Sequence, residues 1–345
     1  MRPIGGEFEI SSASLRVGSP TMPPQPASGR AALFQILRHA LAGRAGAHVA
    51  LPRYLCESVV HAVTAAGFIP CFYDVTRDLR ADRADLSRVL ASGPAAVMFI
   101  SYFGLVDSAD DIAFAKDAGP ETIVIQDDVH SPFERRDPTG AHYAFTSLRK
   151  ALPVVDGAPV TPRLPVPLDA SPAPFSFAKL AGAFAKHARA PDGAFLRLLA
   201  DGEQMLDLAA SYSGAMSWMS ASLLASLDLD DIAKQRRENF RTLEAAIAPL
   251  GLESIVPLDG RRVPLFLPVR VQDRDRVRRG LAARGMFCPA HWPRPHGHDD
   301  ALAPARRLYD SELSLIIDQR YDGSDMERIA EALRDLDASS DRTEA

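Results

Sequence analysis

Long apolar runs are missing from this sequence of 345 residues. None reaches the roughly 18 residues that a membrane-spanning helix needs. The first ten residues, MRPIGGEFEI, carry acidic side chains where a signal peptide needs an apolar core. A basic excess is also missing, because 39 Lys and Arg face 44 Asp and Glu, for a formal net charge of −5. We therefore expect a cytoplasmic protein that binds neither membrane nor nucleic acid.

Cysteine is scarce. An odd number at wide spacing fits neither a disulfide framework nor a zinc pattern, so the thiols are expected to be reduced. The three positions are Cys56, Cys71 and Cys288.

Lysine is also scarce, since five of the 39 basic residues are lysine and the rest are arginine. A position that stays lysine against this bias can need an amine that loses its proton, which arginine cannot supply. A solvated lysine is the ordinary alternative at each position. The five are Lys116, Lys150, Lys179, Lys186 and Lys234.

Short apolar runs alternate with helical patterns along the first half of the chain. The apolar runs are 48–52, 68–75, 95–103 and 122–128. The helical patterns are 29–44, 55–67, 83–92 and 107–119. This alternation predicts an α/β fold with a mostly parallel sheet between helices.

The length favours more than one domain. We expect a large domain over 1–215, a bridging helical region over 216–250, a smaller C-terminal α/β domain over 251–337 and a disordered tail over 338–345. Seven prolines in 152–175 indicate irregular structure there.

Two strand ends carry chemistry. Asp127 ends the run IQDD, and Lys150 lies in the following AFTSLRKALP. Ligands gather beyond the carboxyl ends of parallel strands. A carboxylate keeps a pyridinium nitrogen protonated, a lysine amine condenses with an aldehyde, and the helix start at Ser28-Gly29 suits a phosphate. Together these groups point to pyridoxal phosphate (PLP) as the cofactor.

The chain resembles the DegT/DnrJ/StrS family of sugar aminotransferases, which are fold-type I PLP-dependent enzymes. The likeness rests on the order and spacing of several short motifs. They are IGGEFEI near the start, SGRAAL at 28–33, VALPRYLCESVVHAVTAAGFIPCFYDV at 49–75, FISYFG at 99–104, VIQDDVHSPF at 124–133, SLRKALPVVDG at 147–157, and LSLIIDQRY.

The resemblance implies roles for single residues. Asp127 would pair with the pyridine nitrogen, and His130 would lie near the ring and its phenolic oxygen. Asp128 would face away. Ser147 would contact the phosphate, and Lys150 would bond to the aldehyde carbon of the cofactor. Taken singly, these acids, the histidine and the serine could also be a helix cap, a core residue and a strand-end hydroxyl.

The phosphate turn and the ring face follow from the same likeness. Gly29, Arg30 and Ala31 occupy the phosphate-binding turn. Where many relatives place an aromatic residue on the cofactor ring, this chain has Cys56, with Tyr54 two residues earlier. A thiol can pack on a ring face, and Tyr54 is the other candidate.

The resemblance implies a PLP-dependent aminotransferase that acts on a nucleotide-linked keto sugar with an amino-acid donor, expected to be glutamate, in polysaccharide or secondary-metabolite biosynthesis, as a homodimer. The alternatives are another reaction of the same fold, such as a dehydratase or an amino-acid-processing enzyme, and a PLP-binding protein without turnover. The Asn-Tyr-Arg stretch of the family is not recognisable in SGAMSWMSAS.

A histidine-rich segment, AHWPRPHGHDD at 290–300, could suit a metal on composition alone. Its spacing does not bring the ligands together, so we expect no metal. We interpret it as a loop that reaches the active site from the small domain. A nicotinamide cofactor is not expected either, since GRAALF lacks the second and third glycines of a dinucleotide turn.

Overall fold

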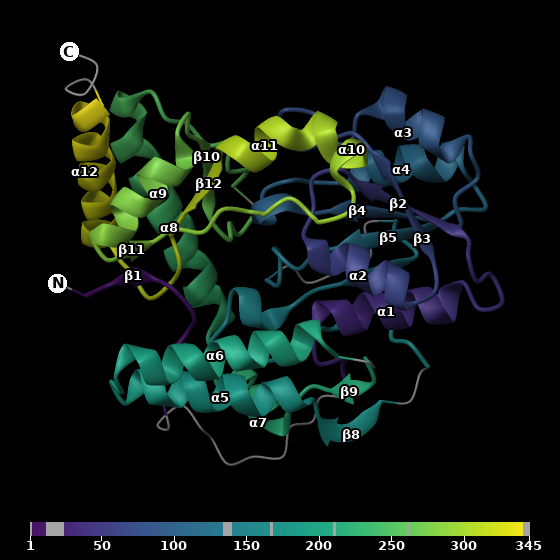
Figure 1. The fold of residues 1–345 in the computed structure, drawn as a ribbon, viewed down its shortest axis with the longest axis horizontal. Helices are drawn as coiled ribbons and strands as arrows, with labels where there is room; N and C mark the ends of the chain where they lie inside the picture. The colour runs from purple at the N-terminus through teal and green to yellow at the C-terminus, as the bar shows by residue number, and fades with distance from the viewer. Residues whose placement is uncertain are drawn as a thin grey trace.

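The computed structural model of the chain describes residues 2–11, 24–133, 140–165, 168–209, 212–260 and 262–340. Its largest sheet has six strands in the order β3-β2-β4-β5-β6-β7 (Figure 1). They are β2 (His48–Pro52), β3 (Ile69–Tyr73), β4 (Ala96–Ile100), β5 (Ile123–Asp127), β6 (Tyr143–Phe145) and β7 (Val160–Thr161). Neighbours from β3 to β6 are parallel, and β7 joins antiparallel. The predicted α/β class with a mostly parallel sheet is confirmed.

Helices lie on both faces of this sheet (Figure 1). α1 (Gly29–Ala40) precedes β2, and α2 (Glu57–Ala65), α3 (Arg83–Leu90) and α4 (Ala109–Ala118) connect the strands from β2 to β5. All five residues of β4 are buried, and successive side chains point to opposite faces. Met98 belongs to the core cluster that contains residues of α1 and α2, whereas Val97 belongs to the cluster of α3 and α4. A strand covered on both faces explains the unbroken apolar run AVMFI.

The carboxyl end of the sheet gathers the predicted site residues. β5 ends at Asp127, and the turn after β6 leads into the short 3-10 helix η3 (Leu148–Lys150). α1 begins at Gly29 behind Ser28, whose hydroxyl oxygen accepts a hydrogen bond from the amide of Ala31 at 3.2 Å. An open parallel sheet binds ligands at this edge.

A close backbone contact ties this edge to the C-terminal half. Gly104, in η2 (Tyr102–Gly104), has a φ of +72°. A Cβ there would lie 2.4 Å from the carbonyl oxygen of Val263 and 2.8 Å from that of His130. The amide of Leu265 donates to the carbonyl oxygen of Phe103 at 2.7 Å. Glycine is thus required for the strand end, the His130 turn and residues 263–265 to meet.

A helical hairpin follows the sheet, in a region for which the sequence analysis assigned no helix. It consists of α5 (Pro174–His187) and α6 (Asp192–Asp207), which lie side by side below the sheet (Figure 1). Gly182 and Gly202 allow the close approach, because a Cβ at either would come within 2.8 Å of Leu199 or Lys179 side-chain atoms. β8 (Asp169–Pro172) and β9 (Gly214–Ala215) pair next to this hairpin.

The bridging region is helical but broken. It forms α7 (Trp218–Leu224) and α8 (Leu229–Ile247), followed by η4 (Ala248–Leu250). Asp228 starts α8 as its N-cap and accepts hydrogen bonds from the amides of Asp230 and Asp231. A capping aspartate inside the expected helix therefore explains why two helices form.

The C-terminal elements form a second set. They are β10 (Leu267–Arg270), α9 (Arg274–Ala283), β11 (Met286–Phe287), α10 (Asp299–Leu302), η5 (Ala303–Ala305), α11 (Arg306–Ser311), β12 (Glu312–Leu315) and α12 (Gly323–Ser340). β10 and β12 are antiparallel, and β1 (Ile4–Gly5) pairs parallel with β11. The first strand therefore packs with the C-terminal elements. The domain boundaries remain predictions; α12 includes 338–340, and 341–345 lie outside the described residues.

In the described part of the chain, no helix combines the length and apolar character that crossing a membrane requires.

Candidate active site

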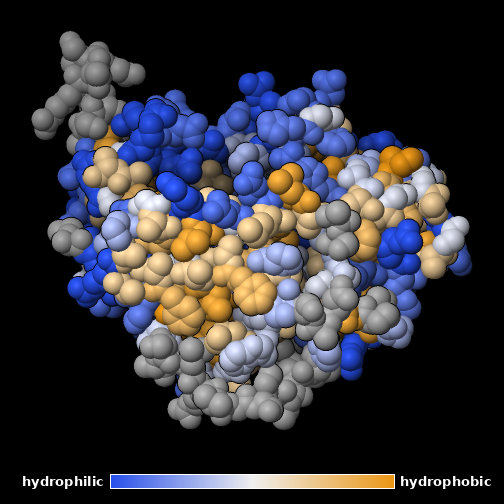
Figure 2. All heavy atoms as spheres, turned by 60° about the horizontal axis from the view of Figure 1, so that its bottom comes forward, coloured by the Kyte–Doolittle hydropathy of each residue, from blue (hydrophilic) through white to orange (hydrophobic). Residues whose placement is uncertain are grey.

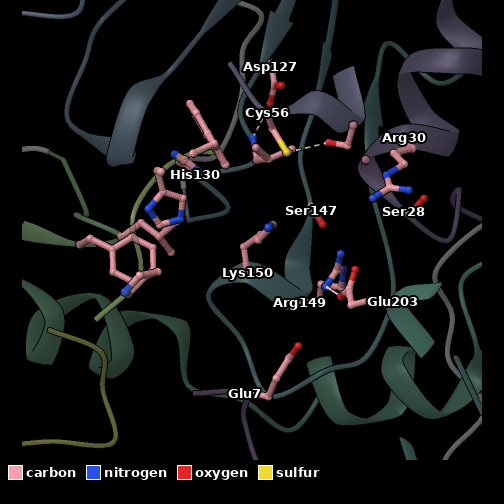
Figure 3. Close-up of a pocket in the computed structure, with 18 of the residues that line it drawn as sticks. Glu7, Ser28, Arg30, Cys56, Asp127, His130, Ser147, Arg149, Lys150 and Glu203 are labelled. Atoms are coloured by element: carbon pink, nitrogen blue, oxygen red, sulfur yellow. Dashed lines mark hydrogen bonds and ion pairs between the residues drawn. The ribbon is translucent and has the colours of Figure 1, made fainter. Parts of the chain in front are cut away.

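A cavity of about 500 Å³ opens at the carboxyl end of the sheet. Its wall is built from the ends of β4 and β5, from η3, from the first turns of α1 and α2, from α6, and from loops of the C-terminal half. Side chains from distant parts of the sequence therefore face one space (Figure 3). Its volume lies within the range of small-molecule sites.

Lys150 extends into this space between Asp127 and Cys56 on one side and Glu7 on the other (Figure 3). Within the described residues, its amine has no hydrogen-bond or ion-pair partner. Burial lowers the pKa of Lys150, and the adjacent Arg149 charge lowers it further. Both effects favour the neutral, nucleophilic amine.

The two aspartates after β5 differ in position. Asp127 lines the cavity, is 3% exposed, and accepts a hydrogen bond from the amide of Val129 at 2.9 Å. Asp128 does not line it. Its carboxylate lies behind the strand end and accepts from Ser101 at 2.5 Å and from Gln126 at 3.1 Å. The arrangement is the one expected from the motif, with Asp127 toward the site and Asp128 away from it.

His130 forms the next part of the wall. Its Nδ1 accepts a hydrogen bond from the amide of Phe103 at 3.1 Å, which places the proton of the neutral ring on Nε2. The ring stacks between Phe103 and Trp292, with centroid distances of 5.6 and 5.5 Å. Burial holds the pKa of His130 well below its usual range, aided by His291 and Lys150. His130 is thus a neutral hydrogen-bond donor at the cavity.

The start of α1 offers amides to an anion. Gly29 and Arg30 line the cavity, and their amides have no acceptor within the helix. A Cβ at Gly29 would lie 3.2 Å from Val129 and 3.8 Å from Ser147, so a side chain would enter the space between them. Ser147 lines the same part of the wall. Ala31 does not line this cavity, and its amide donates to the Ser28 hydroxyl.

The Arg30 side chain turns to α6. It forms an ion pair with Asp207 at 2.5 Å and donates to the carbonyl oxygen of Leu206 at 3.1 Å. The backbone amide of Arg30 is therefore available to an anion at the start of α1, whereas its guanidinium is engaged by α6.

Cys56 and Tyr54 differ in their position relative to the cavity. Cys56 lies at the N-cap of α2, lines the cavity and accepts a hydrogen bond from Ser58 at 3.1 Å. Tyr54 is fully buried outside the cavity wall, stacks on Tyr102 at 5.7 Å and donates its hydroxyl proton to the carbonyl oxygen of His291. Of the two candidates for the ring face, only Cys56 reaches the cavity.

A charged network missed by the sequence analysis borders Lys150. Arg149 forms an ion pair with Glu203 of α6 at 2.7 Å, and Lys179 of α5 bridges Glu203 and Glu7 at 2.6 and 2.7 Å. Burial acts to raise the pKa of Glu203, but Arg149 and Lys179 outweigh it and lower that pKa to about 2. The network anchors α6 beside the lysine. Only the position of Arg149 next to Lys150 hinted at it in the sequence.

The histidine-rich loop contributes two residues to the wall, His291 and Trp292. The other histidines are elsewhere, for example His298, whose ring lies 5.4 Å from that of Phe72. Among the described residues, no group of three or more His, Cys, Asp and Glu side chains is arranged to hold a metal ion.

The groups in the wall suit a phosphorylated pyridine aldehyde. An amine without a partner among the described residues, a buried carboxylate, a neutral imidazole donor and the cradle at Gly29 surround one cavity. Each matches a different part of such a molecule: aldehyde, ring nitrogen, phenolic oxygen and phosphate. The fold and site thus define an α/β protein with a small-molecule cavity at the carboxyl end of a mostly parallel sheet.

Solved structures share this fold. One is the putative sugar aminotransferase Spr1654 from Streptococcus pneumoniae in its PLP form, with a TM-score of 0.73 and 15% identity over 98% of this chain and 99% of that chain. A DegT DnrJ EryC1 StrS aminotransferase from Brucella abortus gives a TM-score of 0.66 and 18% identity over 91% and 85%. The predicted resemblance is confirmed at the level of the fold.

A third similar structure is DesI, solved in the presence of its TDP-sugar product. It gives a TM-score of 0.66 and 20% identity over 93% of this chain and 83% of that chain. No family model matches the sequence, and neither does any curated protein.

Proposed function

We propose that the protein is a PLP-dependent aminotransferase of the DegT/DnrJ/StrS type, which transfers an amino group from an amino acid, with glutamate as the donor, to a nucleotide-linked keto sugar. The observation that carries this proposal is the unpartnered amine of Lys150 in a cavity that also contains Asp127 and the start of α1. The sugar substrate is proposed from the fold shared with sugar aminotransferases, one solved with a TDP-sugar product.

The residues of the wall divide the work of holding the cofactor. The amides of Gly29 and Arg30 and the Ser147 hydroxyl would hold its phosphate, and Asp127 would hold the ring nitrogen. His130 would donate from Nε2 to the phenolic oxygen, and Cys56 would pack on a ring face. When bound, the cofactor supplies an electron sink for breaking bonds at an amine-bearing carbon.

Lys150 moves the proton. Its lowered pKa favours the neutral amine, which would hold the cofactor through its aldehyde and would serve as the base for a proton on the substrate carbon. The neighbouring Arg149 cannot take over, because its guanidinium is tied to Glu203 and remains protonated. Arg149 instead fixes the turn that carries the lysine.

An amino-transfer assay tests this function directly. The protein is incubated with PLP, glutamate and a panel of TDP- and UDP-linked keto sugars, and mass spectrometry detects the amino sugar and 2-oxoglutarate in equal amounts. Loss of water from the sugar would instead indicate a dehydratase. Conversion of the amino acid alone would indicate an amino-acid-processing enzyme. A cofactor absorbance band without any turnover would favour a binding protein.

We also propose that the protein is a cytoplasmic homodimer in polysaccharide or secondary-metabolite biosynthesis. The support for self-association is an apolar surface. Phe177 of α5 is 61% exposed, Leu196 of α6 is 55% exposed and Trp218 of α7 is 60% exposed. Figure 2 shows that hydrophobic residues gather on the face of the molecule to which α5, α6 and α7 contribute. Such patches mark interaction sites.

Sedimentation measures the oligomeric state. We expect a species of twice 37.3 kDa at micromolar concentration, and a shift toward monomer for Phe177→Ser combined with Leu196→Ser. The matched control is Ile69→Ser. Ile69 is 47% exposed and lies on β3, the edge strand at the opposite side of the sheet from β7. A wild-type monomer at tens of micromolar would contradict the proposed dimer.

A further inference from the structure

A buried carboxyl lies behind the cavity wall, on β12. Glu312 and Ser314 are two residues apart on the strand, so their side chains share a face, and both are fully buried. The Ser314 hydroxyl lies 2.6 Å from Oε1 of Glu312 and 2.8 Å from Nδ1 of His291. The His291 amide donates to Oε2 of Glu312 at 2.6 Å. A continuous hydrogen-bond chain thus links the carboxyl to the imidazole.

The other end of this chain faces the site. His291 lines the cavity, and its Nε2 has no hydrogen-bond partner among the described residues, although it is not sealed from solvent. The ring is held by edge contacts with His130 at 5.5 Å and by Phe266 at 4.9 Å. With Nδ1 engaged by Ser314, Nε2 is the nitrogen that a bound molecule meets.

We propose that the Glu312 carboxyl, acting through the Ser314 hydroxyl, decides which ring nitrogen of His291 carries the proton, and thereby whether the cavity meets a hydrogen-bond donor or an acceptor at Nε2. Glu312 is a positioning residue in this scheme. The mechanism described above uses neither Glu312 nor Ser314.

The protons balance along the chain. With Glu312 protonated, its O–H donates to Ser314, the serine O–H donates to Nδ1, and Nε2 carries the ring proton. When the system loses one proton, the Glu312 proton moves to Ser314, the serine proton moves to Nδ1, and the Nε2 proton leaves to the cavity. The end state is a carboxylate, a serine that donates to it, and an unprotonated Nε2. No oxidant or other reactant is needed.

The electrostatics place the loss of this proton from the Glu312–Ser314–His291 chain near neutral pH. Burial raises the pKa of Glu312 to about 8, against hydrogen bonds from Ser314 and the His291 amide and the charge of Arg274. Because this pKa exceeds the value of 4.5 for a free side chain, Glu312 favours the folded state below pH 4.5, and that contribution is lost as the pH rises through about 8. At pH 7 the carboxyl therefore holds its proton.

The neighbouring groups keep one form across this range. Burial raises the pKa of Cys288 to about 12 and holds that of Tyr54 well above its usual range, so both stay protonated. Burial lowers the pKa of His291 to about 3, with help from Lys150, so its ring stays neutral. His130 across the cavity is neutral too. Burial and the charge of Arg149 also lower the pKa of Lys150, which lines the same cavity, so the pH dependence of turnover alone could not be assigned to Glu312.

Nitrogen NMR reads the tautomer without turnover. The full-length protein is labelled with ¹⁵N in its nine histidines, and His291→Asn assigns the His291 signals. Between pH 6 and 9.5 the protonated nitrogen should change from Nε2 to Nδ1, with a midpoint near 8. A His291 that keeps one tautomer throughout would overturn the proposal.

Variants test whether Glu312 and Ser314 cause the change of the His291 tautomer. In Glu312→Gln the side-chain oxygen can still accept from the His291 amide while the NH₂ donates to Ser314, so the ring should stay protonated on Nε2 at every pH. Ser314→Ala should remove the pH dependence by breaking the chain. The matched control is Glu244→Gln on α8, whose carboxyl also has a raised pKa through burial, and which should switch as the wild type does. Switching that persists in Glu312→Gln would overturn the proposal.

The effect on catalysis rests on the proposed function. Since Glu312→Gln imitates the protonated form, its kcat/KM should equal that of the wild type at pH 6.5 and differ by up to about tenfold at pH 9.5, the value of one hydrogen bond. Equal kcat/KM values for Glu312→Gln and the wild type at both pH values would show that no bound molecule uses Nε2. That result would overturn the proposed effect on catalysis. If the wild type transfers no amino group, the proposed function fails, while the NMR result still decides the relay.

Discussion

Replacing Lys150 by arginine is expected to reduce amino transfer by at least about 10⁴-fold, because the change removes both the attachment point and the base. Arginine keeps the positive charge but cannot condense with an aldehyde. The matched control is Lys116→Arg. Lys116 lies in the last turn of α4, outside the cavity wall, and donates to the carbonyl oxygen of Gly140 at the surface. That variant should keep wild-type rates.

Chemical trapping checks the same assignment without turnover. After incubation with PLP and reduction with borohydride, peptide mapping should find the cofactor mass on Lys150. The chain has five lysines, and Lys179 and Lys186 both lie within ion-pairing distance of glutamates, at 2.7 and 3.4 Å. Modification of one of these, or of Lys116 or Lys234, in place of Lys150 would contradict the assignment.

Exchanging Asp127 for asparagine is expected to lower the rate by about 100-fold or more, the usual effect of losing a major electrostatic contact in a site. The carboxylate lines the cavity at the end of β5 and is the acid that we propose holds the ring nitrogen. The control, Asp128→Asn, removes the adjacent buried carboxylate that contacts Ser101 and Gln126 instead.

The rates of the two variants should differ even when both fold. Circular dichroism and thermal unfolding establish folding first, since Asp128 is fully buried and its variant can lose stability. Under saturating cofactor, Asp128→Asn should stay within a few-fold of the wild type. Equal losses, or a larger loss for Asp128→Asn, would show that the motif register is wrong.

The sheet and its helices could be predicted because their pattern is local. Runs such as AVMFI and IVIQD are continuous and apolar, as expected for strands covered on both faces, and a helical segment separates them. Asp127 and Lys150 could be placed because each follows a strand at the same edge of the sheet. Short-range periodicity and a simple rule of topology carried these predictions.

Features that depend on distant residues were not predictable. Glu203 is 54 positions from Arg149 and meets it only because the α5–α6 hairpin folds back under the site. Cys56 and Tyr54 are two residues apart, and the direction of the chain after β2 decides which one is buried. The break at Asp228 did leave a local signal, since LDLDDIAK contains a capping aspartate.

The pairing of β1 with β11 has a consequence for the order of folding. Ile4 pairs with Met286, 282 residues later, and the amide of Gly5 donates to the Tyr321 hydroxyl, 316 residues later. Contacts of such sequence separation form late, because a long loop must close first. During synthesis β1 cannot pair until β11 has been made. Glu7, which follows β1, takes its place in the cavity wall only after this pairing. The nascent chain therefore completes its binding cavity only after β11 has been synthesised.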